Sequence, residues 1–528
     1  MMNPVELVVG LILAAAVLST LARKIKIPYP VLLVMGGIVL GFVPGLPIVH
    51  IPPDIVFLVF ITPLVYIAST RTTLRDFRSN LRPILVLSIG LVAATLVVVA
   101  AVMHWSVPGL GWAGAFVLAS IIGPTDTMAV TAIASETAIP RRIGTILEGE
   151  SLINDIVALV AYKMAIDAVS SGSIPVSTAV IALIWNSAAG IAVGLVVGIA
   201  ACQIRKRLED QVESVSVSLL TGYAAYLGAE MLDASGILAT VTAGLYVGRQ
   251  LSRILLPEGR IQAYFFWDTV TFLIEGLAFV LIGLELRTIM EDLGNVPFSQ
   301  LVAYGLLISV TVILLRLVWV FGFAYLPRIW TGTRQEAEPP YVWQHVLLLG
   351  WAGMRGVDSL AAALAIPLVM SGGQTPFPDR NLIMFLSFCV IVATLVVQGL
   401  SLPFLIRRLE LKNDNQDEVE EGLARIAAAE AALNRLEQHV VARDVDPEVL
   451  DELRSAYGKK LQQANAQLNP ADCQENSMCA DAVRQLREEL LMSERQTVIE
   501  LRDQGKISDD VLRRIERSLD YEFLRQQG

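Results

Sequence analysis

Charged residues are scarce in this chain of 528 residues: they make up 17% of it, whereas a soluble globular protein has about 25%. The net charge is −10, and an acidic surface argues against nucleic acid as a partner. Cysteine and histidine are also rare, with four of each, and no histidine accompanies Cys473 and Cys479 at a zinc spacing. We expect reduced thiols, no cofactor and no enzyme, because no metalloprotease, hydrolase or phosphate-loop motif is visible.

Apolar residues are abundant instead, at 54%, and the mean hydropathy is +0.60. Up to about Leu405 they form blocks of roughly 17 to 25 residues, the length that a helix needs to cross a bilayer core of about 30 Å. The sequence therefore predicts an all-α polytopic membrane protein with thirteen spans. These are 5–22, 30–46, 54–69, 83–103, 112–134, 144–167, 176–202, 214–232, 234–249, 264–286, 299–327, 343–370 and 381–405. The eighth and ninth form a tight hairpin at Asp233.

The chain changes character after this transmembrane domain, residues 1–405. Residues 406–528 hold 26 acidic and 18 basic residues, against 24 and 22 in the membrane domain. The stretches 418–441 and 479–504 are rich in Ala, Leu, Glu and Arg, which favours helices. We expect a helical cytoplasmic tail that aids assembly or trafficking; a regulatory domain is the alternative.

Basic residues alternate sharply between the predicted loops. One set of loops carries 17 of them, and the opposite set carries only Arg287 and Arg380. The positive-inside rule places the first set in the cytoplasm. We therefore predict an N-terminus outside and a tail inside the plasma membrane, which in bacteria is the inner membrane.

The fifth segment contains a break. Gly123-Pro124 interrupts the backbone hydrogen bonds of the helix, and the freed carbonyl groups must be paired or must line a wet cavity. Asp126 follows, and a carboxylate at a broken helix is typical of the cation site of a secondary transporter. The alternative is a proline kink in which Asp126 only caps the next half-helix.

The sixth segment contains the candidate carrier, Asp155. Inserting a carboxylate at the bilayer centre costs about 3 kcal/mol, so we expect Asp155 either to pair with another group or to have a function there. Ser151 lies four residues earlier on the same helix face. Oxygen atoms of Asp155, Ser151 and the freed carbonyl groups near Thr125 suit a hard cation, and loss of water favours the protonated carboxyl group. Asp155 is thus predicted to hold either a proton or a monovalent metal cation; the alternative is a structural ion pair.

The twelfth segment has three glycines within seven residues, Gly350, Gly353 and Gly356. They favour close packing or a second break. Arg355 lies between them and would place a fixed positive charge near the site. Arg316, deep in the eleventh segment, needs an acidic partner.

Several strings resemble the monovalent cation–proton antiporter-1 family, which contains the sodium/proton exchangers. The likeness covers nearly the whole chain, and its most specific part runs from Glu148 to Asp155. The strings are Thr125-Asp126, Glu148-Gly149-Glu150-Ser151-Leu152-Ile153-Asn154-Asp155, Phe279-Val280-Leu281-Ile282-Gly283-Leu284, Gly353-Met354-Arg355-Gly356 and Gln398-Gly399-Leu400. The tail from Glu494 to Leu519 also resembles the tails of bacterial members.

The resemblance implies two inverted repeats that build a dimerisation part and a mobile core, with the fifth and twelfth segments as crossing broken helices. It also implies a homodimer in membrane lipid. Asp155 would carry the exchanged cation or proton, and the neutral Asn154 beside it implies electroneutral exchange. The other implied site residues are the ligands Ser151 and Thr125, the crossing residues Asn154 and Asp126, the ion pair Glu150–Arg316 and the core residue Arg355.

The sequence departs from the family pattern at three positions. Thr127 stands where proline is usual, and Ile67 stands where the third segment commonly has an acidic residue. Asp358 stands where an apolar residue is common, and we predict that it supports the core and replaces the negative charge missing at Ile67. Glu275 in the tenth segment is expected to pair with a basic residue or to sense pH.

The resulting prediction is a sodium/proton antiporter that works by alternating access. Potassium or another monovalent cation such as lithium is an alternative substrate, because selectivity depends on cavity size and ligand geometry. A cation channel is a further alternative, which a fixed ratio of proton to cation flux would exclude. An intramembrane enzyme would need a nucleophile or a metal set, and none is visible.

Overall fold

The computed structural model describes most of the membrane domain and part of the tail. The described residues are 4–25, 27–43, 56–72, 74–126, 130, 139–171, 176–208, 210–255, 257–293, 297–331, 342–370, 375–409, 416–440, 447–468, 494, 496–498, 500, 504 and 515. Thr127, Cys473, Cys479 and most of the predicted 479–504 tail helix lie outside them. The chain divides into two compact units, 1–413 and 414–528.

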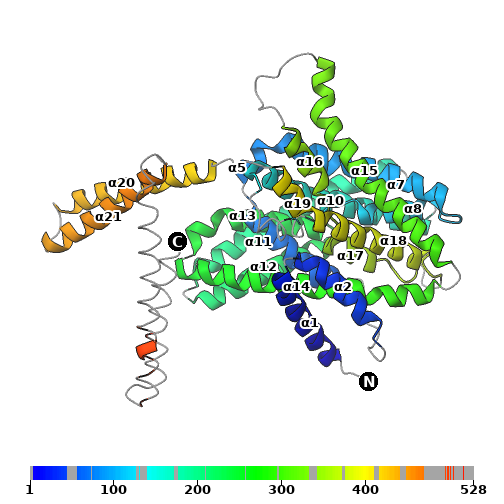
Figure 1. Ribbon diagram of the computed structural model, residues 1–528, viewed down its shortest axis with the longest axis horizontal. Helices are drawn as coiled ribbons and strands as arrows, with labels where there is room; N and C mark the ends of the chain where they lie inside the picture. The colour runs from blue at the N-terminus through cyan, green and yellow to red at the C-terminus, as the bar shows by residue number, and fades with distance from the viewer. Residues whose placement is uncertain are drawn as a thin grey trace. The chain divides into compact units, whose positions relative to one another are not determined.

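The described part of the first unit is helical, and its only β-bridge joins Val369 to Pro376. The predicted all-α class is therefore confirmed. The elements, drawn in Figure 1, are α1 (Pro4–Ile25), α2 (Tyr29–Gly41), the π-helical turn η1 (Phe57–Ile61), α4 (Thr62–Arg71), α5 (Leu74–Ser79), α6 (Leu81–Leu85), the π-helical turn η2 (Val86–Leu91), α7 (Val92–Ser106), α8 (Trp112–Ile122), α10 (Arg141–Ser171), α11 (Val176–Arg205), α12 (Gln211–Glu230), α13 (Gly236–Ile254), α14 (Pro257–Asp292), α15 (Phe298–Thr331), α16 (Trp343–Trp351), α17 (Val357–Leu364), α18 (Arg380–Ala393), the π-helical turn η3 (Thr394–Gln398) and α19 (Gly399–Arg408).

Six helical stretches within the described residues are long and apolar enough to cross a membrane. They are Val8–Ile25, Leu81–Ser106, Trp185–Arg205, Gly259–Leu281, Phe298–Tyr325 and Arg380–Arg408. Shorter apolar helices, Tyr29–Gly41, Phe57–Arg71 and Trp112–Ile122, accompany them. The number thirteen and the inverted repeats stay predictions.

Helix ends follow local sequence signals. Asp210 caps α12 by accepting a hydrogen bond from the Val212 N–H at 2.8 Å, and Ser235 caps α13 by accepting one from the Leu238 N–H at 3.4 Å. Between these helices Asp233 has a φ of 51°, a left-handed conformation that closes a short turn. The tight hairpin predicted at Asp233 is thereby confirmed.

Small residues let neighbouring helices approach closely. A Cβ atom added at Gly194 of α11 would lie 2.2 Å from the Ala239 carbonyl oxygen of α13. Likewise, a Cβ atom at Gly283 of α14 would lie 2.2 Å from the Ile38 nitrogen of α2. Such backbone contacts replace the hydrophobic effect as a source of helix association in lipid.

Two segments of the first unit are broken. α8 ends at Ile122, directly before Gly123-Pro124, and residues 123–126 are not helical. The twelfth segment breaks as predicted, because α16 ends at Trp351 and α17 begins at Val357. The second half of the fifth segment falls largely outside the described residues.

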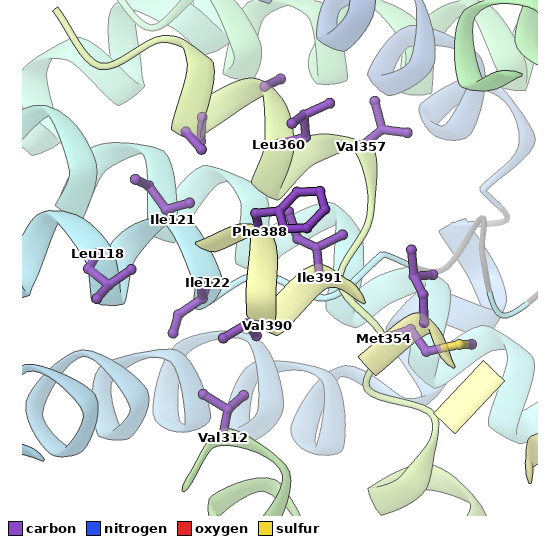
Figure 2. Close-up of a cluster of buried hydrophobic side chains, with 14 of the residues drawn as sticks. Leu118, Ile121, Ile122, Val312, Met354, Val357, Leu360, Phe388, Val390 and Ile391 are labelled. Carbon is purple, nitrogen blue, oxygen red and sulfur yellow. The ribbon is translucent and has the colours of Figure 1, made fainter. Parts of the chain in front are cut away.

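Buried apolar side chains from four helices pack around the ends of the broken helices. Figure 2 shows residues of α8, α15, α17 and α18 gathered in one cluster, with Phe388 and Ile391 of α18 among them. Ile121 and Ile122 of α8 have no exposed surface, and Val357 is 2% exposed. This packing fixes the ends of the broken helices, and with them the polar residues that follow.

The described tail unit contains two helices, α20 (Gln416–Val440) and α21 (Pro447–Leu468). They pack against each other as a hairpin, visible in Figure 1. Gly422, Ala429 and Ala464 are buried in this hairpin, the two alanines with 6% and 3% exposure. The first predicted tail helix, 418–441, thus coincides with α20.

Candidate functional site

The two broken segments are joined by hydrogen bonds at Asp126. Its backbone N–H donates to the Met354 carbonyl oxygen at 2.8 Å, and its Oδ2 atom accepts from the Val357 N–H at 3.2 Å. Asp126 therefore caps α17, a helix from the other broken segment, at its positive N-terminal end. A Cβ atom at Gly356 would lie 1.7 Å from Asp126 Oδ2, so only glycine fits there.

Arg355 satisfies carbonyl groups that the helix breaks leave free. Its side chain is buried; Nε donates to the Ile122 carbonyl oxygen at 3.1 Å and Nη1 donates to the Gly353 carbonyl oxygen. Its backbone N–H donates to Thr394 Oγ1 at 3.2 Å. The guanidinium thus supports the crossing and lines neither cavity described below.

Glu150 and Arg316 form a buried ion pair between α10 and α15. Arg316 Nη1 donates to Glu150 Oε1, and Nη2 donates to Oε2 at 2.9 Å. The side chains are 0% and 1% exposed for Arg316 and Glu150 respectively. Arg316 also donates to the Leu349 carbonyl oxygen at 3.3 and 3.2 Å, which ties α15 to α16.

Thr125 and Asn154 extend this network to the crossing. The Thr125 hydroxyl donates to Glu150 Oε1 at 3.1 Å and accepts from Asn154 Nδ2 at 2.9 Å. The network therefore runs from Asn154 through Thr125 and Glu150 to Arg316. Asn154 Oδ1 is buried and has no hydrogen-bond partner among the described residues.

Asp155 lies one residue further along α10 and faces a different environment. It lines a cavity of about 220 Å³ together with Ser151, Asp126, Glu275 and Asp358. Within the described structure its Oδ1 atom is buried and accepts no hydrogen bond. An unpaired buried carboxylate oxygen is costly unless it binds a proton or a cation.

One end of this cavity reaches the basic side of the membrane domain. Arg71 and Thr72, at the end of α4, and Glu148, near the start of α10, line it. These residues adjoin loops that the positive-inside rule assigns to the cytoplasm.

A second, smaller space lies on the other side of Asp155. It measures about 30 Å³ and is lined by Tyr162, Leu159 and Ile237, beyond Asp155 toward the opposite end of α10. Asp155 and Asp358 are the only described residues that line both spaces. The candidate carrier is thus one of two residues shared by the walls of both spaces.

Glu275 and Ile67, the two other positions with an expected link to the site, have different surroundings in the structure. Glu275 lines the larger cavity, and its Oε2 atom accepts a hydrogen bond from the Tyr29 hydroxyl at 2.6 Å. The expected pairing with a basic residue is not seen among the described residues, and pH sensing stays a prediction. Ile67 is 5% exposed in an apolar cluster with Tyr66 and Trp267, and it lines neither space. No local pattern singles out Tyr29, because the rest of α2 has no polar side chain.

The comparisons with known proteins agree with this architecture. The family model "sodium/hydrogen exchanger, transmembrane" matches residues 11–408. The chain belongs to the sodium/hydrogen exchanger family. The exchanger is thus a multi-pass membrane transporter, and the resemblance noted from its sequence is confirmed.

Its relatives span most of the exchanger's length. An uncharacterized Na⁺/H⁺ exchanger of Mycobacterium tuberculosis is 34% identical over 523 residues, which cover 98% of this chain and 95% of the relative. The sodium, potassium, lithium and rubidium/H⁺ antiporter of Bacillus subtilis is 32% identical over 416 residues, 76% of this chain and 61% of that protein. The sodium proton antiporter MjNhaP1 of Methanocaldococcus jannaschii, solved at pH 8, has the same fold, with a TM-score of 0.60 at 20% identity over 75% of this chain and all of MjNhaP1.

Proposed function

We propose that this exchanger moves sodium out of the cytoplasm in return for external protons, and that Asp155 carries both ions in turn. The observation that carries the proposal is the position of Asp155. Its Oδ1 atom is buried without a partner among the described residues, and Asp155 lines two spaces whose other α10 residues lie on opposite sides of it along the helix. Ser151 supplies a hydroxyl ligand on the same cavity wall.

Transport proceeds by alternating access. Asp155 loses its proton on one side and binds a cation; the core then moves relative to the dimer interface and exposes the site to the other side. The larger cavity and the predicted topology together correspond to a state open to the cytoplasm. An empty, charged carboxylate is costly to move through the membrane, and this cost couples the two fluxes. At low pH Asp155 stays protonated and exchange slows.

The neutral residue beside Asp155 supports electroneutral exchange by analogy with the family. Asn154 contributes no charge and its amide nitrogen bonds Thr125, so it belongs to the network that holds the crossing. One proton on Asp155 is then exchanged for one monovalent cation. The proposed assembly is a homodimer in the plasma membrane, with the N-terminus outside and the tail in the cytoplasm.

A broader cation preference is the second candidate. The Bacillus subtilis relative is named for sodium, potassium, lithium and rubidium, and it covers 76% of this chain. Carboxylate and hydroxyl oxygens bind all these cations, so the ligand types do not distinguish them.

Exchange in everted membrane vesicles tests the proposal. A preformed proton gradient should be dissipated when sodium is added, as dequenching of a pH-sensitive dye, and lithium and potassium are compared at the same concentrations. Vesicles with Asp155→Asn should show no dequenching at equal protein level. Cation flux without proton movement in the wild type would instead indicate a channel.

A further inference from the structure

A second carboxylate shares the position of Asp155 between the two spaces. Asp358 lies in the first turn of α17, on the other broken segment. It lines the larger cavity with Asp155, and it is the only other described residue that also lines the smaller space. A cation at this point is therefore flanked by carboxylates from two different helices.

We propose that Asp358 is a second direct ligand of the transported cation and that it sets a preference for small cations, lithium and sodium, over potassium. The inference rests on the proposed function, because it concerns the same site. It differs from a supporting role in the core in that the Asp358 carboxylate contacts the ion itself.

The neighbouring carboxylates are already engaged in structural contacts. Asp126 Oδ2 accepts the Val357 N–H and so serves the N-terminus of α17. Glu150 is paired with Arg316, away from both spaces. Glu275 Oε2 accepts a hydrogen bond from the Tyr29 hydroxyl on the wall of the larger cavity, whereas Glu275 Oε1 is buried without a partner among the described residues. The capping task that an acidic residue in the first turn of α17 could perform is thus taken by Asp126.

No basic side chain lies between Asp155 and Asp358 among the described residues that line the two spaces. Arg71 is the single arginine on these walls; it belongs to the end of α4, where it pairs with Asp268 at 2.5 Å. Arg355 is bonded to backbone carbonyl groups instead. Two carboxylates without a basic neighbour are costly in a buried site, and binding a cation or a proton between them compensates one of the two charges.

The selectivity follows from the strength of the field that two carboxylates produce. Coulomb attraction increases as the ion radius decreases, and the number and field strength of the ligands decide which cation gains most on leaving water. A site with two carboxylates favours lithium and sodium, whereas a site with one carboxylate favours small ions less strongly. Loss of Asp358 should therefore weaken sodium binding more than potassium binding.

Exchange kinetics in proteoliposomes distinguish direct ligation of the cation by Asp358 from the general effect of a negative charge near the cavity. Asp358→Asn is compared with Glu148→Gln, which removes one negative charge from an exposed position at the mouth of the same cavity. Asp358→Asn should raise the sodium KM about ten-fold, leave kcat at saturating sodium within about two-fold, and shift the sodium-to-potassium preference toward potassium by about five-fold. Glu148→Gln should change the KM less than two-fold.

Thermal stabilisation by sodium gives a second measurement if Asp358→Asn does not transport. A ligand that binds only the folded state raises its stability with concentration. Monodisperse Asp358→Asn protein should need about ten-fold more sodium than the wild type for the same rise in Tm.

The outcomes distinguish this inference from the proposed function. An unchanged sodium KM and sodium-to-potassium preference in Asp358→Asn, or an equal change in Glu148→Gln, would overturn the inference while leaving Asp155 as the carrier. A wild-type protein without sodium/proton exchange would overturn the proposed function itself.

Discussion

Removing one partner of the Glu150–Arg316 pair should destabilise the membrane domain strongly. Both side chains are almost completely buried, so Glu150→Gln leaves a guanidinium without its counter-charge. Breaking a buried ion pair in this way costs about 3–5 kcal/mol. Arg316 would keep its hydrogen bonds to the Leu349 carbonyl oxygen, which places the expected loss near the lower end of that range.

A double-mutant cycle measures the interaction free energy between Glu150 and Arg316. Unfolding by sodium dodecyl sulfate is followed for Glu150→Gln, Arg316→Met and the double variant in purified protein. The double variant should lose less free energy of unfolding than the sum of the two single variants, by about 2 kcal/mol or more, because both charges leave together.

An exposed ion pair provides the matched control. Lys163 and Glu230 lie 3.4 Å apart with side chains 58% and 42% exposed. Exposed pairs contribute up to about 1 kcal/mol, so Glu230→Gln should change stability far less than Glu150→Gln. Equal effects of the two substitutions, or additive losses in the Glu150–Arg316 cycle, would refute the reasoning.

Two further substitutions test the crossing and the cavity wall. Gly356→Ala places a Cβ atom against Asp126 Oδ2 and should lower the Tm and reduce the exchange rate at least ten-fold. The control Gly322→Ala has open space around the added atom and should behave as the wild type. Normal exchange by Gly356→Ala would contradict the close contact. Tyr29→Phe removes the hydrogen-bond donor of Glu275 and should cost about 1–3 kcal/mol in the same unfolding assay. The effect of Tyr29→Phe should largely disappear in a Glu275→Leu background, and a loss that persists there would show that the tyrosine acts through another contact.

The sequence predicted the features that depend on the cost of polar groups in lipid. Arg316 needs an acidic partner at its depth in the membrane. The three closely spaced glycines allowed either close packing or a break in the twelfth segment, and the family resemblance implied the break. The structure places Glu150 against Arg316 and breaks the helix between Trp351 and Val357.

Features that depend on the direction of a side chain could not be predicted from the sequence. Asn154 and Asp155 are adjacent, yet the first bonds Thr125 and the second faces the cavity, because neighbouring residues on a helix point about 100° apart. Tyr29 meets Glu275 across 246 positions of the chain, and no local pattern indicates such a contact. In the sequence Asp358 stands out only as a departure from a family pattern, and its place beside both spaces depends on how the two broken segments pack.

The central claim is that the Asp155 carboxylate binds a proton or a metal cation but never both. Proton release on sodium addition to purified protein in weakly buffered detergent solution measures this competition directly. We predict that, at a pH where the carboxyl group is largely protonated, saturating sodium releases close to one proton per chain from the wild type and none from Asp155→Asn. Sodium binding to the wild type without proton release, or unchanged release from Asp155→Asn, would contradict the account.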